Sequence, residues 1–165
     1  MLLAQVNVAR MRGAPDSPAM AGFMAAADPI YRMAEGSAGF VWRLRDAGGH
    51  LPTCRDDADG WLVVNVSMWV SYEALHAFTY RSVHGGLVRR RAEWFLPTRQ
   101  PSTALWWLPD DDRPGLDQAL ARLTVLRREG PSPRAFSLRH RFEPDGRPAR
   151  RRAASGSALR GSAAG

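Results

Sequence analysis

The residues best suited to chemistry are a histidine and a tyrosine near the middle of the chain. His84 follows Tyr80 by four positions, a spacing that places two side chains on one face of a helix. A histidine can act as an acid, a base or a metal ligand near neutral pH. The alternative is a structural histidine that caps or packs a helix end before Gly85-Gly86. We predict His84 as a catalytic residue, with Tyr80 as its helper.

Two asparagines, Asn7 and Asn65, each interrupt an apolar run that is typical of a strand. A buried amide costs free energy unless it is hydrogen-bonded, so a pair of them in a sheet is either a structural bridge or the polar wall of a pocket. We predict that the two strands are central neighbours and that the amides lie close together. In that pocket, Asn7 belongs to the catalytic group and Asn65 binds the substrate.

Six tryptophans are many for a chain of 165 residues. Large amphipathic rings line cavities well, although some of these rings must simply pack a core or a dimer interface. Trp106 and Trp107 are adjacent on a predicted strand and must point to opposite faces. The predicted substrate-binding residues are Asn65, Trp69, Trp42, Phe78, Phe23, Arg43, Trp94 and Trp106.

Several familiar site motifs are missing from the sequence. It has no HxxxH or CxxC spacing, so no multi-ligand metal site is expected. Neither a glycine-rich phosphate loop nor a dinucleotide fingerprint is present. Arg43 and Arg81 are candidates for binding a substrate carboxylate. The run Arg89–Arg91 with Glu93 predicts a solvated helix face with an internal Arg–Glu pair.

The elements that must position these residues follow from the periodicity of apolar residues. Alternation predicts strands over residues 3–10, 39–45, 61–70, 103–108 and, at the sheet edge, 135–142. Helices are predicted over 18–35, over 71–94 with a break near residues 85–86, and over 114–128. Pro29 should kink or break the first helix, and residues 46–60 are predicted to form a loop.

The resulting order, β-α-β-β-α-β with an added helix and strand, is the ferredoxin-like α+β pattern. Its antiparallel sheet carries helices on one face, so we expect the other face to be buried by a second copy in a homodimer. One domain is expected over residues 1–142. Residues 143–165, rich in arginine, alanine, glycine and serine, should form a disordered tail.

Composition narrows the class of protein further. The hydrophobic content of 45% favours a packed globule, and no apolar run approaches the roughly 18 residues of a membrane span. Without a basic leader before the short apolar N-terminus, a cytoplasmic location is expected. The single cysteine, Cys54, excludes an intrachain disulfide. The net charge of +7 comes entirely from arginine and is concentrated in the tail, so no specific nucleic-acid partner is expected.

Specific segments resemble the DUF3291 family across roughly residues 2–142. They are LAQVNVAR, MAGFMAAADPIYRMAEGSAGFVWRL, VNVSMWVSYEALHAFTYRSVH, RRRAEWF and LWWLP. The resemblance implies a dimeric α/β-barrel fold related to the antibiotic-biosynthesis monooxygenases, and no single reaction. The haem-degrading branch of that superfamily uses an asparagine on the first strand, then a tryptophan and a histidine on the second main helix. Asn7 and His84 match two of these by position, and Phe78 falls at the tryptophan position.

Three functions therefore stay open at this point. The first is a small tailoring enzyme for an apolar aromatic or polyketide-like molecule, either monooxygenase-like without a cofactor or isomerase/cyclase-like. In that enzyme His84 shuttles a proton, and the two asparagines orient a carbonyl or phenol oxygen. The second is a haem protein with His84 as the axial ligand. The third is a non-enzymatic binding protein for an apolar metabolite.

Overall fold

The computed structural model describes residues 1–56, 58–83 and 86–149, and for residues 81–83 and 86–89 it describes the backbone alone. No helix in these ranges is long and apolar enough to cross a membrane. The elements are β1 (Leu2–Arg10), α1 (Pro18–Glu35), β2 (Phe40–Arg43), β3 (Thr53–Arg55), β4 (Trp61–Trp69), α2 (Tyr72–Val83), α3 (Gly86–Trp94), β5 (Thr103–Leu108) and α4 (Leu116–Glu129).

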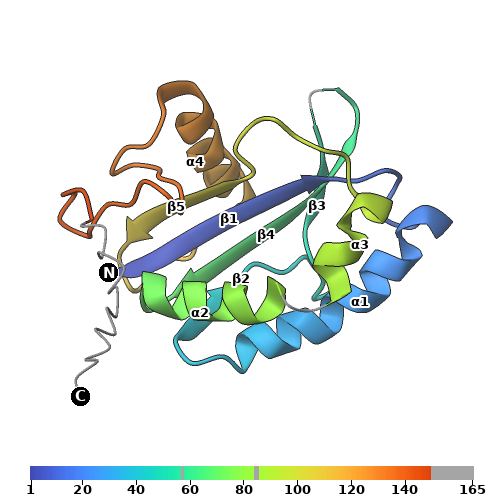
Figure 1. Ribbon diagram of the computed structural model, residues 1–165, viewed down its shortest axis with the longest axis horizontal. Helices are drawn as coiled ribbons and strands as arrows, with labels where there is room; N and C mark the ends of the chain where they lie inside the picture. Colours follow the sequence, from blue (N-terminus) through green and yellow to red (C-terminus); the bar gives the residue numbers. More distant parts are fainter. Residues whose placement is uncertain (57, 84–85, 150–165) are drawn as a thin grey trace, which may run out of the picture.

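The strands form one antiparallel sheet in the order β2-β4-β1-β5, with β3 also paired to β4 (Figure 1). Its centre is made by β1 and β4, which are rich in valine, a residue that suits a pleated, buried surface. These strands pair continuously from Leu3 opposite Trp69 to Arg10 opposite Leu62. The predicted ferredoxin-like α+β fold is therefore confirmed.

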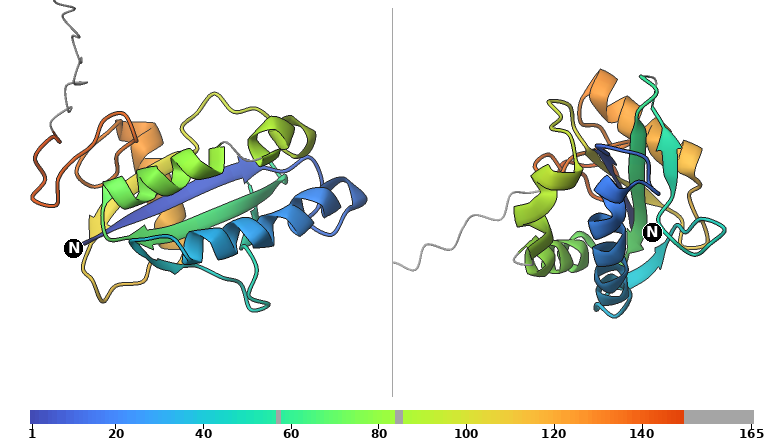
Figure 2. Two further views of the ribbon diagram at one scale, coloured as in Figure 1. Left: turned by 60° about the horizontal axis from the view of Figure 1, so that its bottom comes forward. Right: turned by 90° about the vertical axis from the view of Figure 1, so that its right-hand side faces the viewer.

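Helices α1, α2 and α3 lie on one face of this sheet, which we call the helical face (Figures 1 and 2). Helix α2 begins after Ser71, whose hydroxyl accepts a hydrogen bond from the backbone N–H of Ala74 at 3.2 Å. The turn before β2 places Gly39 against the same helix. Its φ is +81°, and a Cβ there would lie 2.5 Å from the Cβ of Ala74, so only glycine fits this approach. Helix α1 buries Met20, Phe23, Ala27 and Ala34.

The added helix α4 packs on the opposite face, where alternation directs Val6 of β1 and Val66 of β4 (Figure 2). Residues Ala119, Leu123 and Leu126 of α4 complete this apolar core. The sequence-based argument for a dimer assumed that this face lies open. Because α4 covers it, the topology does not require a second copy there, and a partner would have to contact another surface.

Three local predictions need correction. Pro29 does not break α1, which continues to Glu35, since buried residues on both sides of the proline hold the two halves on the sheet. The predicted loop over residues 46–60 contains β3, which pairs with β4. The predicted strand over 135–142 is wrong, because only Phe136 pairs with β5, at Leu105. Beyond it the chain leaves the edge, and the indole of Trp107 donates to the carbonyl of Phe142 at 2.7 Å.

Residues 143–149, which the sequence places in the tail, form a hydrogen-bonded turn with Gly146 at a φ of +83°. The backbone N–H of Glu143 donates to the carbonyl of Arg147 at 2.8 Å. Residues 150–165 lie outside the described residues, and with them most of the predicted tail.

Candidate functional site

A cavity of about 250 Å³ lies between the sheet and helices α1 and α2. A second lobe of about 180 Å³ continues along the same face beside α1 and α3, and the two lobes share Asn7, Tyr31 and Asn65 in their lining. Each lobe is below the range of roughly 300–1,000 Å³ typical of pockets for drug-sized ligands, and the two together reach it. The site is thus suited to a small, elongated molecule.

The floor of the cavity carries two polar rows that run across the sheet. Asn7 of β1 lies opposite Asn65 of β4 and, on its other side, opposite Thr103 of β5. In the neighbouring row, two residues from the asparagines on each strand, Gln5 lies opposite Ser67. Since side chains two residues apart point to the same face of a strand, all five project towards α1 and α2. These are the only two asparagines in the chain, and the fold places them side by side.

Hydrogen bonds orient one amide and leave others free for a ligand. The Nδ2 of Asn7 donates to the hydroxyl of Thr103 at 2.6 Å and to the carbonyl of Ser102 at 3.4 Å. Because the carbonyl can only accept, the nitrogen faces β5 and the Asn7 Oδ1 remains as an acceptor. The side chains of Gln5 and Asn65 make no hydrogen bond with any described residue. A half-buried amide without a partner is a ready donor and acceptor for a bound molecule.

The walls of the larger lobe are aromatic and aliphatic. Trp69 stacks on Phe78 of α2 with ring centroids 5.2 Å apart and meets Phe40 edge-on at 5.3 Å. The indole nitrogen of Trp69 donates to the hydroxyl of Ser67 at 3.0 Å, so the ring is held flat against the floor. The remaining apolar wall comes from Ile30, Ala34, Leu75 and Leu138. Flat rings such as these favour an aromatic ligand.

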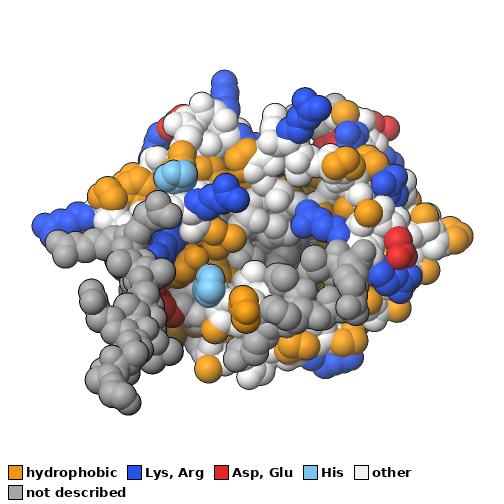
Figure 3. All heavy atoms as spheres, viewed as in Figure 1, with side chains coloured by type: hydrophobic (Ala, Val, Ile, Leu, Met, Phe, Trp, Pro, Cys, Tyr) orange, Lys and Arg blue, Asp and Glu red, His pale blue; other side chains and the backbone are white. Residues whose placement is uncertain are grey.

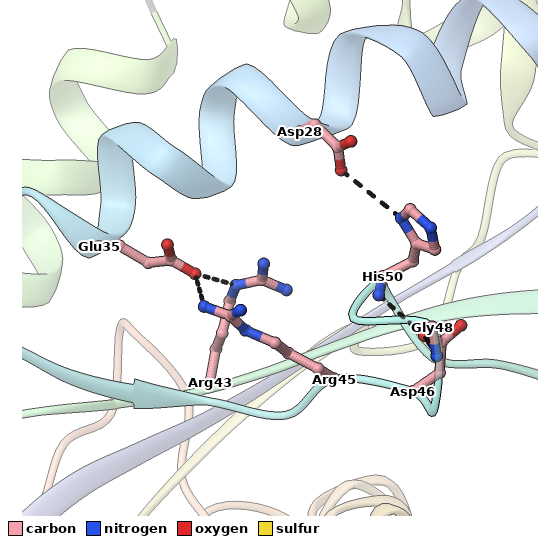
Figure 4. A network of polar contacts seen from close by, with 7 residues as sticks. All are labelled: Asp28, Glu35, Arg43, Arg45, Asp46, Gly48 and His50. Carbon is pink, nitrogen blue, oxygen red and sulfur yellow. Dashed lines mark hydrogen bonds and ion pairs between the residues drawn. The ribbon is translucent and has the colours of Figure 1, made fainter.

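The end of the larger lobe near β2 carries a buried cation (Figure 4). The Nε of Arg43 donates to Glu35 of α1 at 2.6 Å, and the Nη2 of the exposed Arg45 donates to the same carboxylate oxygen at 2.5 Å. The hydrogen bond from Arg43, together with the two positive charges, lowers the pKa of Glu35 below its ordinary value. Only 9% of the Arg43 side chain is exposed, and its Nη1 is buried without a hydrogen-bond partner among the described residues.

Tyr31 of α1 stands between the two lobes and beside this cation. The guanidinium carbon of Arg43 lies 4.9 Å from the centre of its ring. Burial raises the pKa of Tyr31 far above its ordinary value, although the charge of Arg43 opposes the shift. The hydroxyl is therefore neutral at physiological pH, and it makes no hydrogen bond with the described part of the chain. It can serve as a donor to a ligand oxygen and cannot serve as a base.

Charge is unevenly distributed around the site. Figure 3 shows arginine side chains near the centre of the helical face and acidic ones towards its margins. At one margin, Asp28 approaches His50 at 4.0 Å (Figure 4). Among the described residues, no carboxylate and no histidine lines either lobe. No group of three metal-ligating side chains occurs in this part of the chain either.

Five of the residues predicted from the sequence come together in the larger lobe. They are Asn7, Asn65, Trp69, Phe78 and Arg43. Phe23 lines the second lobe, and Trp94 lies behind it with ring centroids 5.9 Å apart. The expected Arg–Glu pair on α3 is also present, where Arg90 donates to Glu93 at 2.8 Å.

Three predicted residues lie away from this cavity: Trp106, Trp42 and Tyr80. Trp106 is buried under α4, and Trp42 packs against the same apolar core, because alternation along their strands turns both to the opposite face. Tyr80 is 63% exposed and lines neither lobe. His84 lies outside the described residues, as does the side chain of Arg81, so their predicted roles stay predictions.

Five polar residues that line the larger lobe were missed by the sequence analysis: Gln5, Ser67, Thr103, Tyr31 and Thr79. Two of them were detectable, because Gln5 is two residues from Asn7 and Ser67 is two residues from Asn65. Period-two polar pairs on two strands that are expected to be neighbours indicate a polar floor. Tyr31 had no such pattern, since its position over the sheet depends on how α1 packs.

The fold and the site thus describe a ferredoxin-like α+β domain with a covered cavity on its helical face. The family model described as a domain of unknown function, DUF3291, matches residues 2–152, and the chain belongs to this family. No curated protein matches the chain. Among solved structures it is similar to the structure of Rv0793 from Mycobacterium tuberculosis, at 18% identity over 68% of this chain and 98% of that chain, with a TM-score of 0.41. A likeness this distant carries no argument about function.

Proposed function

We propose that this protein is a small-molecule tailoring enzyme that acts on an apolar aromatic or polyketide-like substrate bearing an oxygen function. The observation that carries the proposal is the polar floor of Asn7, Asn65 and Gln5 inside an otherwise apolar, covered space. Gln5 and Asn65 are half-buried and form no hydrogen bond with a described residue. Their amides on the cavity floor are therefore donors and acceptors that a ligand can use.

The arrangement suits chemistry on an enolate or phenolate. Asn65 and Tyr31 can donate hydrogen bonds to an oxygen as it gains negative charge, and the Oδ1 of Asn7 can accept from a hydroxyl of the substrate. In this proposal His84 takes the proton from the substrate and returns it to the product. The deprotonated substrate then reacts either with oxygen, in a cofactor-independent monooxygenation, or within itself, in an isomerisation or cyclisation.

We also propose that the protein is related to the antibiotic-biosynthesis monooxygenases, forms a homodimer and is located in the cytoplasm. The ferredoxin-like strand order supports the relation, and the dimer rests on the fold that the resemblance in sequence implies. Since α4 covers the second face of the sheet, the partner copy would contact the outer surface of the helices or a sheet edge. Size-exclusion chromatography with light scattering tests the dimer, and a monomer at micromolar concentration contradicts it.

Haem remains a prediction from the resemblance alone. The axial ligand would be His84, which lies outside the described residues, and each lobe is smaller than a pocket for a drug-sized ligand. The described residues thus favour a smaller molecule. Purified protein titrated with hemin decides the matter: a shifted Soret band that His84→Ala abolishes would establish haem binding.

The enzymatic proposal is tested with a panel of phenolic and enolic aromatic compounds, with and without oxygen, and products are followed by mass spectrometry. We expect His84→Ala to lower turnover by about 10²–10⁴-fold, the usual contribution of a general acid–base residue. His76→Ala is the matched control, because His76 is an exposed histidine on α2. Equal turnover in the two variants would contradict the role of His84. Tight binding without turnover of any compound would instead favour a binding protein.

A further inference from the structure

We infer that the substrate carries a carboxylate, which Arg43 binds through the end of its guanidinium that is not bonded to Glu35, at the β2 end of the larger lobe. This inference rests on the proposed function, since it names the substrate class of the same cavity. It narrows the proposed substrate from any oxygen-bearing apolar molecule to an apolar monocarboxylic acid.

The first argument is the state of the Arg43 guanidinium. Its Nε is committed to Glu35, whereas neither Nη1 nor Nη2 donates to a described residue. Nη1 is fully buried without a partner among the described residues, and the side chain as a whole is more than nine-tenths buried. An arginine is always charged and carries five donors in a rigid fork. Nη2 keeps accessible surface and has no partner in the described part of the chain, so it is the terminal nitrogen that a carboxylate oxygen can reach.

The second argument is the local balance of charge. Glu35 is shared by Arg43 and Arg45, so two cations face one carboxylate (Figure 4). Arg45 is about half exposed and well solvated, whereas Arg43 is buried and shares its carboxylate partner with Arg45. Because no acidic side chain among the described residues lines the cavity, a ligand carboxylate there would add a second negative charge beside the two cations without meeting a like charge on the cavity wall.

The third argument is the position of this cation relative to the polar rows. Arg43 pairs in register with Ser67, which lies opposite Gln5, while the two asparagines form the next row along β1 and β4. Rows two residues apart are separated by about 7 Å along a strand. If the substrate carboxylate lies at the row of Gln5 and Ser67, a second oxygen function on the substrate, roughly one aromatic ring away, would lie over the two asparagines. Trp69, which lies beyond Ser67 on the side away from Asn65, and Phe78 of α2 supply an apolar wall at this end of the lobe.

A carboxylate fits this end better than a phosphate does. A phosphate dianion usually recruits several cations or a row of backbone N–H groups. Here one buried guanidinium lies over the ring of Tyr31, whose hydroxyl is a neutral donor in the lining of the same lobe. One cation and one neutral donor match a single negative charge.

The test compares three matched pairs of probes by isothermal titration calorimetry at pH 7.5: 2-naphthoate and 2-naphthamide, cinnamate and cinnamamide, and octanoate and octanamide. We expect at least one acid to bind tenfold or more tightly than its amide. Arg43→Met should abolish this preference while the amide still binds. Arg45→Met is the matched control and should keep the preference, because Arg45 is exposed and holds only Glu35.

A second variant guards against misfolding of Arg43→Met, whose fold is checked by circular dichroism. Glu35→Gln keeps Arg43 but removes the competing carboxylate, so the acid should bind severalfold more tightly than it binds the unmodified protein. Equal binding of acids and amides, or a preference that survives Arg43→Met, overturns the carboxylate inference and leaves the proposed function standing. Failure of every acid and every amide to bind overturns both.

Discussion

The two faces of the sheet are built from the same strands, yet they are packed for different purposes. On the α4 face, the side chains of β1 and β4 are valine, alanine and methionine, and they are buried almost completely. On the helical face, the same strands present Gln5, Asn7, Asn65 and Ser67 under helices that leave a cavity. Apolar packing at native density contributes stability, whereas a hollow with unpaired amides does not. The α4 face is thus packed for stability alone, whereas the helical face combines two apolar clusters with a candidate binding cavity.

The largest expected effect is on the α4 face. Leu123 of α4 is 1% exposed, and Leu123→Ala should lower the free energy of unfolding by about 2–5 kcal/mol because it leaves a cavity in a close-packed core. Urea unfolding followed by circular dichroism measures the change. The control is Leu138→Ala, since Leu138 lines the functional cavity and is 40% exposed. If Leu138→Ala costs as much as Leu123→Ala, the two faces do not differ as we describe.

Two substitutions at adjacent positions of β4 test the two faces separately, because neighbouring residues of a strand point to opposite faces. Asn65→Val should weaken binding of a cavity ligand about tenfold, or ~1.4 kcal/mol, while the free energy of unfolding stays the same or rises. Val66→Asn should instead destabilise the protein by about 1–3 kcal/mol or more, because it buries an amide without partners. Calorimetric binding and urea unfolding are measured on both variants. Loss of stability in Asn65→Val would mean that this amide is a structural bridge.

A smaller effect is expected from pH. The pKa of Glu35 is lowered in the folded protein from an ordinary value of 4.5, mainly by the hydrogen bond from Arg43. Its contribution to stability is therefore fully present above pH 4.5 and is lost as pH falls through the lower, folded pKa. The melting temperature should fall less between pH 5 and pH 3 in Glu35→Gln than in the unmodified protein.

The control for the pH experiment is Glu93→Gln. The pKa of Glu93 is also lowered, by its hydrogen bond with Arg90, but this pair lies on the exposed surface of α3, where solvent screens it. Its removal should change the pH dependence less than Glu35→Gln does. The reverse order would show that the Arg43–Glu35 pair is no more protected from solvent than an ordinary surface pair.

Much of the site could be foreseen because strands impose a strict alternation. The apolar runs around Asn7 and Asn65 identified two strands, and the ferredoxin-like order made them neighbours, so their contact followed. The same rule, applied to Trp42 and Trp106, would have turned them away from the cavity had the face of each strand been assigned first. Phe78 was placed correctly because helical spacing directs it towards the sheet.

Local periodicity and the few ways in which such elements connect were enough to predict four of the strands, the helices and the pairing of the two asparagines, but not β3 or the irregular course of residues 135–142. Tertiary packing was needed to show that α4 closes the second face, that Arg43 is buried with terminal nitrogens that no described residue pairs, and that Tyr31 stands over the floor. The reason is physical. Whether a charge or a hydroxyl is buried depends on which helix packs above it and at what distance. The spacing of residues in the sequence does not predict that contact.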